Sequence, residues 1–191
     1  MSAGFQETYW QTASELLEQR DGLLRLRVNG SSMAPLLQAG DIVQVEPTQP
    51  ERLALGDLVV VRRERDFVTH RLVSKSSQNG LTKGDNCAYL DPAFEISAVV
   101  GRVIAIESRD DRLDLRSQKW HNANHWLGNL ARLEARWLNF IQRMPRASSL
   151  PASAASESHA SGFLARALVR LSLIPFRLLI KFIVFLNREI R

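Results

Sequence analysis

The sequence predicts a mainly β domain with a helical C-terminal extension, and three observations lead to this prediction. Residues 23–107 contain short runs rich in β-branched residues, separated by turn-forming residues. From residue 122 onward, hydrophobic residues instead recur every three or four positions, which is the spacing of one helix face. A stretch rich in Ser, Ala and Pro then separates a last amphipathic segment from the rest of the chain.

The composition fits one globular domain with an appendage. The 191 residues (21.6 kDa) are 45% hydrophobic and 24% charged, which excludes a disordered or fibrous chain. Cys87 is the only cysteine, so an internal disulfide and a structural zinc site built on cysteines are both excluded.

Residues 1–22 form the first predicted segment. Their start, MSAGFQETYW, has no basic stretch followed by an apolar one. We therefore expect neither a cleavable signal peptide nor an N-terminal membrane anchor, and we expect this end of the chain in the cytosol. Residues 5–20 are expected to form a short amphipathic helix that ends at Asp21-Gly22.

Residues 23–116 form the predicted β domain. The expected strands are LLRLRV, DIVQVE, DLVVVRR, FVTHRLV and AVVGRVIAIE, and the expected turns between them include NGSS, QAGD, PTQP, SQNG and KGDN. Residues 108–114, SRDDRLD, are expected to form a charged turn.

Residues 117–144 contain a predicted amphipathic helix, over 122–142. Its expected apolar stripe is Trp126, Leu130, Leu133, Trp137, Leu138 and Ile141, and we expect the two tryptophans in the core. His121 and His125 lie four residues apart, but the glutamate of the HExxH metal motif is absent, so we expect them to be solvated. Pro145 ends the helix, and residues 145–162 are expected to form a flexible linker.

The formal net charge of +5 lies entirely in the last segment. Residues 1–161 carry 19 basic and 19 acidic residues, whereas residues 162–191 carry six basic residues and one acid. A nucleic-acid-binding domain normally carries its basic surplus on the surface that docks. We therefore expect no nucleic-acid partner.

Residues 163–191 are predicted to form a cationic amphipathic helix that associates with a membrane. At about 100° per residue, the basic residues at 166, 170, 177, 181 and 188 share one narrow stripe on an otherwise apolar helix. This pattern is typical of a segment that lies in the interface of an anionic membrane, with its bases at phosphate level. Peripheral attachment at the cytoplasmic face is the favoured interpretation. Two alternatives stay open: a helix that packs on the protein or on residues 122–142, and a tilted membrane span.

A set of spaced motifs occurs in the β-rich region. The motifs are Ser32-Met33-x-Pro35-x-Leu37-x-x-Gly40-Asp41-x-Val43-x-Val45, Gly56-Asp57-x-Val59-Val60, Thr69-His70-Arg71 and Lys83-Gly84-Asp85-Asn86. In this order they resemble the signal peptidase I family over roughly residues 28–107. The resemblance implies a signal-peptidase-like β fold and a serine endopeptidase that removes leader segments, with the substrate bound as an extended strand.

The resemblance assigns roles to four residues. Ser32 matches the nucleophile, and His70 matches the base of the Ser/His subtype, where the bacterial enzymes and the related self-cleaving repressors have lysine. Asp91 matches the aspartate that supports the base, and Asp85 is the second candidate for that role. These roles are chemically consistent, because a serine hydroxyl needs a base, and histidine is the side chain that titrates near neutral pH. His70 is the only histidine of the β domain.

Two departures from the family pattern leave alternatives open. Gly30 stands where some family members place a serine that donates to the oxyanion hole, so the backbone amide of Ser32 is the expected donor. The family's N-terminal membrane anchor is not visible, which favours a substrate other than general secretory preproteins. The other hypotheses are a self-cleaving regulator of the same clan and a catalytically silent, membrane-tethered binding module. No cofactor or metal is expected.

Overall fold

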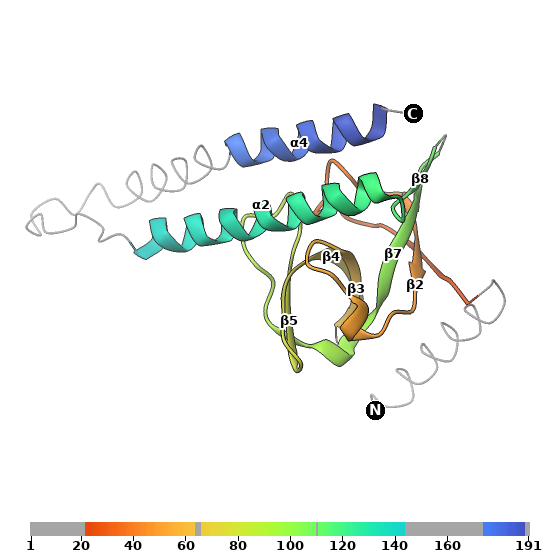
Figure 1. The fold of residues 1–191 in the computed structure, drawn as a ribbon, viewed down its shortest axis with the longest axis horizontal. Helices are drawn as coiled ribbons and strands as arrows, with labels where there is room; N and C mark the ends of the chain where they lie inside the picture. The colour runs from red at the N-terminus through yellow and green to blue at the C-terminus, as the bar shows by residue number, and fades with distance from the viewer. Residues whose placement is uncertain (1–21, 64–65, 110, 144–173, 190–191) are drawn as a thin grey trace, which may run out of the picture.

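The computed structural model describes residues 22–63, 66–109, 111–143 and 174–189 (Figure 1). Its centre is an antiparallel sheet in the order β1-β2-β7-β3-β4-β5-β6, with β8 paired to β7. The strands are β1 (Leu24–Arg27), β2 (Ile42–Glu46), β3 (Leu58–Arg63), β4 (Asp66–Lys75), β5 (Asn79–Lys83), β6 (Phe94–Glu95), β7 (Val99–Glu107) and β8 (Arg112–Asp114). Two helices follow, α2 (Gln118–Arg143) and α4 (Ile174–Glu189), with short 3₁₀ turns η1 (Pro50–Arg52) and η2 (Ile96–Ala98) inside the β domain. The predicted fold class is thereby confirmed.

Each of the five predicted runs contains a strand, but three strands, β5, β6 and β8, were not predicted. The turn after β4 spans residues 76–79, where the Ser76 amide donates to the Asn79 carbonyl, so residues 79–80 already belong to β5. The expectation of a charged turn over 108–114 was also wrong in part. The Ser108 amide donates to the Asp111 carbonyl, which closes the turn early, and Leu113 then pairs with Ile106.

The two faces of the central strands carry different cores. Leu58 and Val60 of β3 point into the larger core, which also contains residues of α2 and α4. Val59 and Val61 point to the other face, into a small cluster with Leu53 and Leu72. This division follows from the two-residue repeat of a strand. It decides which residues of β4 and β5 face the helices.

Ser117 directly precedes helix α2, and its hydroxyl accepts a hydrogen bond from the Trp120 amide at 3.4 Å, as a helix N-cap does. The helix packs closely on the turn before β3. A Cβ on Gly56 (φ +98°) would lie 2.1 Å from the Asn124 carbonyl oxygen, and one on Gly128 would lie 2.6 Å from the Gly56 Cα. The contact therefore needs glycine on both sides.

The predicted buried stripe of α2 was wrong for Trp126, Leu133 and Trp137, whereas Leu138 is buried and Leu130 packs against the core, as predicted. The side chains that face the core are Trp120, Ala123, Asn124, Leu127, Ala131, Glu134, Ala135 and Leu138, whereas Trp126, Leu133, Trp137 and Phe140 are exposed. The helix has apolar residues on two adjoining stripes. Small residues on one of them allow the close approach to the sheet, so that stripe is buried. His121 and His125 are exposed, as expected.

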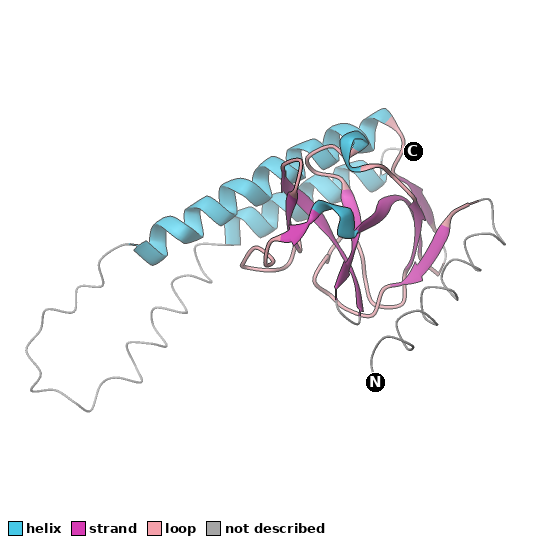
Figure 2. Cartoon of the chain, turned by 90° about the horizontal axis from the view of Figure 1, so that it is seen from below, coloured by secondary structure: helices cyan, strands magenta, loops and turns pink. Residues whose placement is uncertain are grey.

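Helix α4 lies beside α2 along the same side of the sheet (Figures 1 and 2). Ile180 and Val184 are 3% exposed and belong to the larger core. The alternative that this segment packs on the protein therefore holds for residues 174–189. No helix among the described residues is long and apolar enough to cross a membrane. The predicted helix at 5–20, the linker at 145–162 and residues 163–173 lie outside the described residues.

Candidate active site

Ser32 lies in a tight turn that follows β1. The Ala34 amide donates to the Ser31 carbonyl at 3.1 Å, and the Leu36 and Leu37 amides donate to the Met33 carbonyl. Met33 is buried in the core, at 2% exposure, which fixes the turn from inside, while Ser32 stays partly exposed. The turn therefore holds the serine hydroxyl at the surface of the domain on a rigid support.

His70 lies in the middle of β4, opposite Val59 of β3. Its side chain is nearly buried, and its Nε2 lies 2.8 Å from the Ser32 Oγ. Its Nδ1 lies 2.6 Å from the Asp91 Oδ2. When Asp91 is ionised it can only accept, so the proton of a neutral imidazole stays on Nδ1 and Nε2 accepts from the serine hydroxyl. The structure thus brings together three of the four predicted site residues.

Asp91 is held by more than the histidine. The Thr82 hydroxyl donates to its Oδ2 at 2.6 Å, the Asp91 amide donates to the Thr82 carbonyl at 2.9 Å, and Arg63 lies 3.6 Å away. Burial on its own raises the pKa of Asp91, but the hydrogen bonds from His70 and Thr82 and the nearby positive charges outweigh it, and the pKa is lowered. Asp91 is therefore the anionic partner of the imidazole at neutral pH.

Gly84 makes room for the contact between Ser32 and His70. The register of β4 and β5 pairs Arg71 with Lys83, so the next residue of the chain follows directly beside His70. A Cβ on Gly84 would lie 2.7 Å from the Ser32 carbonyl oxygen and 3.1 Å from the His70 Nε2. The adjoining loop also holds the serine turn, because the Asn86 amide donates to the Ser32 carbonyl at 2.8 Å.

Asp85 does not contact His70. It faces the helices, where its carboxylate accepts two hydrogen bonds from Arg71, at 2.8 Å and 2.6 Å. Arg71 is fully buried and also donates to the Gly56 carbonyl and to the Asn124 side chain of α2. The predicted second candidate for the support of the base thus has a different partner, in a buried network that joins the sheet to α2.

A second buried ion pair lies beside the first. Lys83 is fully buried and donates from its Nζ to Glu134 of α2 at 2.7 Å and to the Gly84 carbonyl at 3.3 Å. Burial raises the pKa of Glu134, and the positive charge of Lys83 offsets this only in part. Both residues next to Gly84 in the sequence therefore carry a buried charge, each paired on the helix side of the sheet.

Cys87 lies next to the site and is partly buried. A Cβ on Gly84 would meet its Sγ at 2.7 Å. Burial raises the pKa of the Cys87 thiol; the positive charge of Lys83 offsets this in part, and the negative charges of Asp91 and Asp85 add to it. A thiol in this environment is a poor nucleophile, so Ser32 is the better candidate. No group of three His, Cys, Asp or Glu residues suited to a metal ion exists among the described residues.

Sequence reasoning missed three residues of this region, Thr82, Asn124 and Glu134, and it quoted Arg71 and Lys83 in motifs without giving them a role. A signal was present for Glu134, because it is the only acid in the sequence of α2 and lies in step with Leu127, Ala131 and Leu138. An acid on an apolar stripe indicates a buried partner. Thr82 had no comparable signal, since threonine is common in strands.

The part of the chain that carries Ser32, His70 and Asp91 matches a known family model. The model for Peptidase S24-like proteins matches residues 2–104, which is more than half of the chain. The chain belongs to the Peptidase S24-like family. The family is one of serine peptidases and self-cleaving regulators, so membership assigns the chain to that class. A comparison with curated proteins returned no match.

Proposed function

We propose that this protein is a serine endopeptidase of the signal peptidase I type, in which Ser32 attacks the scissile carbonyl. The observation that carries the proposal is the continuous chain from the Ser32 Oγ to the His70 Nε2, 2.8 Å, and from the His70 Nδ1 to the Asp91 Oδ2, 2.6 Å. This is the arrangement in which an imidazole accepts the serine proton and a carboxylate fixes its tautomer.

The reaction proceeds in two steps. His70 accepts the hydroxyl proton as Ser32 forms a bond to the carbonyl carbon, and it returns the proton to the leaving amine. Water then attacks the acyl-enzyme; His70 accepts a proton from the water and passes it to the Ser32 Oγ as the acyl–oxygen bond breaks. Asp91 stabilises the imidazolium in both steps, and the backbone amide of Ser32 is the proposed donor to the oxyanion.

The proposed substrate is a leader segment of another peptide or preprotein, bound as an extended strand. Strand β1 is the terminal strand of the sheet order and ends five residues before Ser32. A peptide that adds to an edge strand gains main-chain hydrogen bonds. A peptide paired with β1 would run alongside the segment that connects β1 to Ser32, which would bring its scissile bond toward the nucleophile.

The proposal is tested with a mechanism-based serine acylator, read by intact mass. The wild type and Ser31→Ala are expected to gain one adduct, and Ser32→Ala none. Ser31 is the matched control, because it is an exposed neighbouring serine in the same turn. An adduct that persists in Ser32→Ala, or that disappears in Ser31→Ala alone, contradicts the assignment.

A library of leader peptides then separates cleavage of other chains from self-cleavage. Cleavage of added peptide by an intact enzyme supports the proposal. Conversion of the protein itself into two fragments, at a rate independent of concentration and with no cleavage of added peptide, identifies a self-cleaving regulator instead.

A further inference from the structure

The outer side of α2 and α4 is an exposed apolar surface. Of the eleven large hydrophobic side chains that are exposed among the described residues, ten lie on these two helices and only Tyr89 lies elsewhere. Their exposed fractions run from 40% to 67%. We call this surface the two-helix face; its residues are Trp126, Leu133, Trp137, Phe140, Ile174, Leu178, Leu179, Phe182, Phe185 and Leu186. A patch of this extent marks a docking surface.

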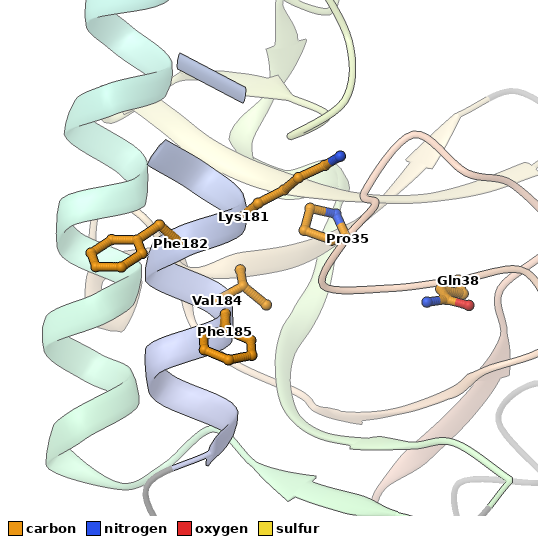
Figure 3. A pocket seen from close by; sticks show the side chains of 6 residues that line it. All are labelled: Pro35, Gln38, Lys181, Phe182, Val184 and Phe185. Carbon is orange, nitrogen blue, oxygen red and sulfur yellow. The ribbon is translucent and has the colours of Figure 1, made fainter. Parts of the chain in front are cut away.

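The face is bordered by basic residues along both long edges. At about 100° per residue, Arg136 lies on the edge of the α2 stripe that is turned away from α4, and Lys181 lies on the edge of the α4 stripe that is turned away from α2. Figure 3 shows the second relation directly: Phe182 points toward α2 and Lys181 toward the loop of Pro35. Both bases are exposed.

No acid balances these charges on the outer side. Among the described side chains of α2 and α4, the only acid is Glu134, which is buried and paired with Lys83. Two adjacent helices with an apolar centre and basic edges match an anionic lipid surface, where apolar side chains enter the acyl region and bases reach the phosphates.

A second copy of the chain fits this face less well. Two-fold pairing places a surface patch against itself. The basic edges of one copy would then meet the basic edges of the other, which is unfavourable. We propose that the two-helix face docks on an anionic membrane surface.

Helix α4 contacts the loop that holds Ser32, so docking would fix the orientation of the candidate active site relative to the membrane. The Arg177 side chain of α4 lies 3.5 Å from the Asn86 carbonyl, and the Asn86 amide holds the Ser32 carbonyl. An open groove of about 510 Å³ lies between α4 and the loop after Ser32, and it is lined by Pro35, Gln38, Lys181, Phe182, Val184 and Phe185 (Figure 3). The use of this orientation for the cleavage of leader segments rests on the proposed function; the docking itself does not.

The test is flotation of the full-length Ser32→Ala protein with vesicles, so that its outcome does not depend on peptidase activity. Vesicles of phosphatidylcholine with about one third phosphatidylglycerol are compared with pure phosphatidylcholine. We expect flotation with the anionic vesicles and at least tenfold weaker partitioning to the neutral ones. A protein that stays at the bottom with both, or that binds both equally, overturns the proposal.

Two pairs of variants locate the surface. Arg136→Glu with Lys181→Glu is expected to weaken partitioning by roughly 25-fold or more, since each base near an anionic surface contributes about fivefold. The matched control is Arg27→Glu with Arg52→Glu, which changes two exposed bases outside the helices. Equal losses in both pairs would show a general charge effect and overturn the location.

The apolar part is tested by Trp126→Gln with Phe182→Gln, which keeps the charge and the helix propensity. We expect at least a tenfold loss of partitioning, with the far-UV circular dichroism unchanged, whereas Tyr89→Gln is the matched control and retains binding. Light scattering, which measures the molar mass in solution, tests the alternative that a second copy of the chain occupies the face. A dimer that this double variant converts to a monomer would assign the face to self-association and overturn the proposal.

Discussion

Asp85 and Asp91 are two aspartates close in sequence, and the structure predicts opposite effects for their replacement. Asp85 is 3% exposed and bonded to the fully buried Arg71, whereas Asp91 contacts His70. Asp85→Asn removes the countercharge of a buried guanidinium. Asp91→Asn removes the partner of the imidazole and leaves the Arg71 pair intact.

The size of the Asp85→Asn effect follows from what is left behind. The amide oxygen can accept only one of the two guanidinium hydrogen bonds, and the amide nitrogen faces a donor. Breaking one side of a buried ion pair costs about 3–5 kcal/mol. A domain of this size unfolds with about 5–15 kcal/mol, so a large part of the free energy of unfolding is lost. At about 2–4 °C per kcal/mol, the melting temperature falls by about 6–20 °C.

The assay is chemical denaturation followed by circular dichroism, beside cleavage of a leader peptide at a temperature where both variants are folded. We expect Asp85→Asn to lose stability and to keep the pH profile of cleavage. We expect Asp91→Asn to keep stability within about 1 kcal/mol and to lose activity by a factor of about 10⁴. If Asp85→Asn is as stable as the wild type but inactive, Asp85 is the residue that supports the base, and the reasoning from the buried pair is refuted.

Two further predictions concern the immediate surroundings of the site. Gly84→Ala inserts a methyl group between the Ser32 carbonyl and the His70 ring, so we expect about a 100-fold loss of kcat; wild-type kcat in a folded variant would contradict the close contact. Thr82→Val removes one hydrogen bond from Asp91, so its pKa, measured by carboxyl ¹³C NMR, is expected to rise toward the ordinary 3.8. Because a lowered pKa stabilises the folded state above pH 3.8 and this contribution is lost as pH falls through the folded pKa, Thr82→Val should be less stable at pH 7 and approach the wild type at acid pH. An unchanged Asp91 pKa would show that the threonine bond does not hold the carboxylate.

The strands and the members of the candidate site were predictable for different reasons. Alternation along β2, β3 and β4 is a local property, so the strands could be found in the sequence. Ser32, His70 and Asp91 were found by resemblance of spaced motifs, because no local pattern shows that residues 38 positions apart in sequence lie 2.8 Å from each other. The choice between Asp85 and Asp91 depends on the side of the sheet that each carboxylate faces after β5. Asp85 faces the helices and binds Arg71, whereas Asp91 binds His70.

The orientation of α2 could not be predicted, because both of its stripes are apolar. The stripe with Trp126 and Trp137 is the more hydrophobic, and periodicity favours it as the buried one. Burial of the other stripe depends on its fit to the turn at Gly56, on Asn124 against Arg71, and on Glu134 against Lys83, all of which join segments far apart in the sequence.

Helix α2 therefore has two roles: its inner side binds buried residues of the sheet, and its outer side is part of the two-helix face. On its inner side, Asn124 and Glu134 bind the buried cations that follow His70 in β4 and precede Gly84 in β5. Without Glu134, the buried Lys83 would lose its countercharge, at a cost of about 3–5 kcal/mol; without Asn124, the Arg71 guanidinium would lose one hydrogen bond. The family match ends at residue 104, so the helix lies outside the matched region although it binds Arg71 and Lys83, the neighbours of His70 and Gly84. Since its outer side forms half of the proposed membrane surface, docking and the geometry of the site are joined through one rigid element. A membrane-bound orientation would then be fixed relative to Ser32 without any hinge between them.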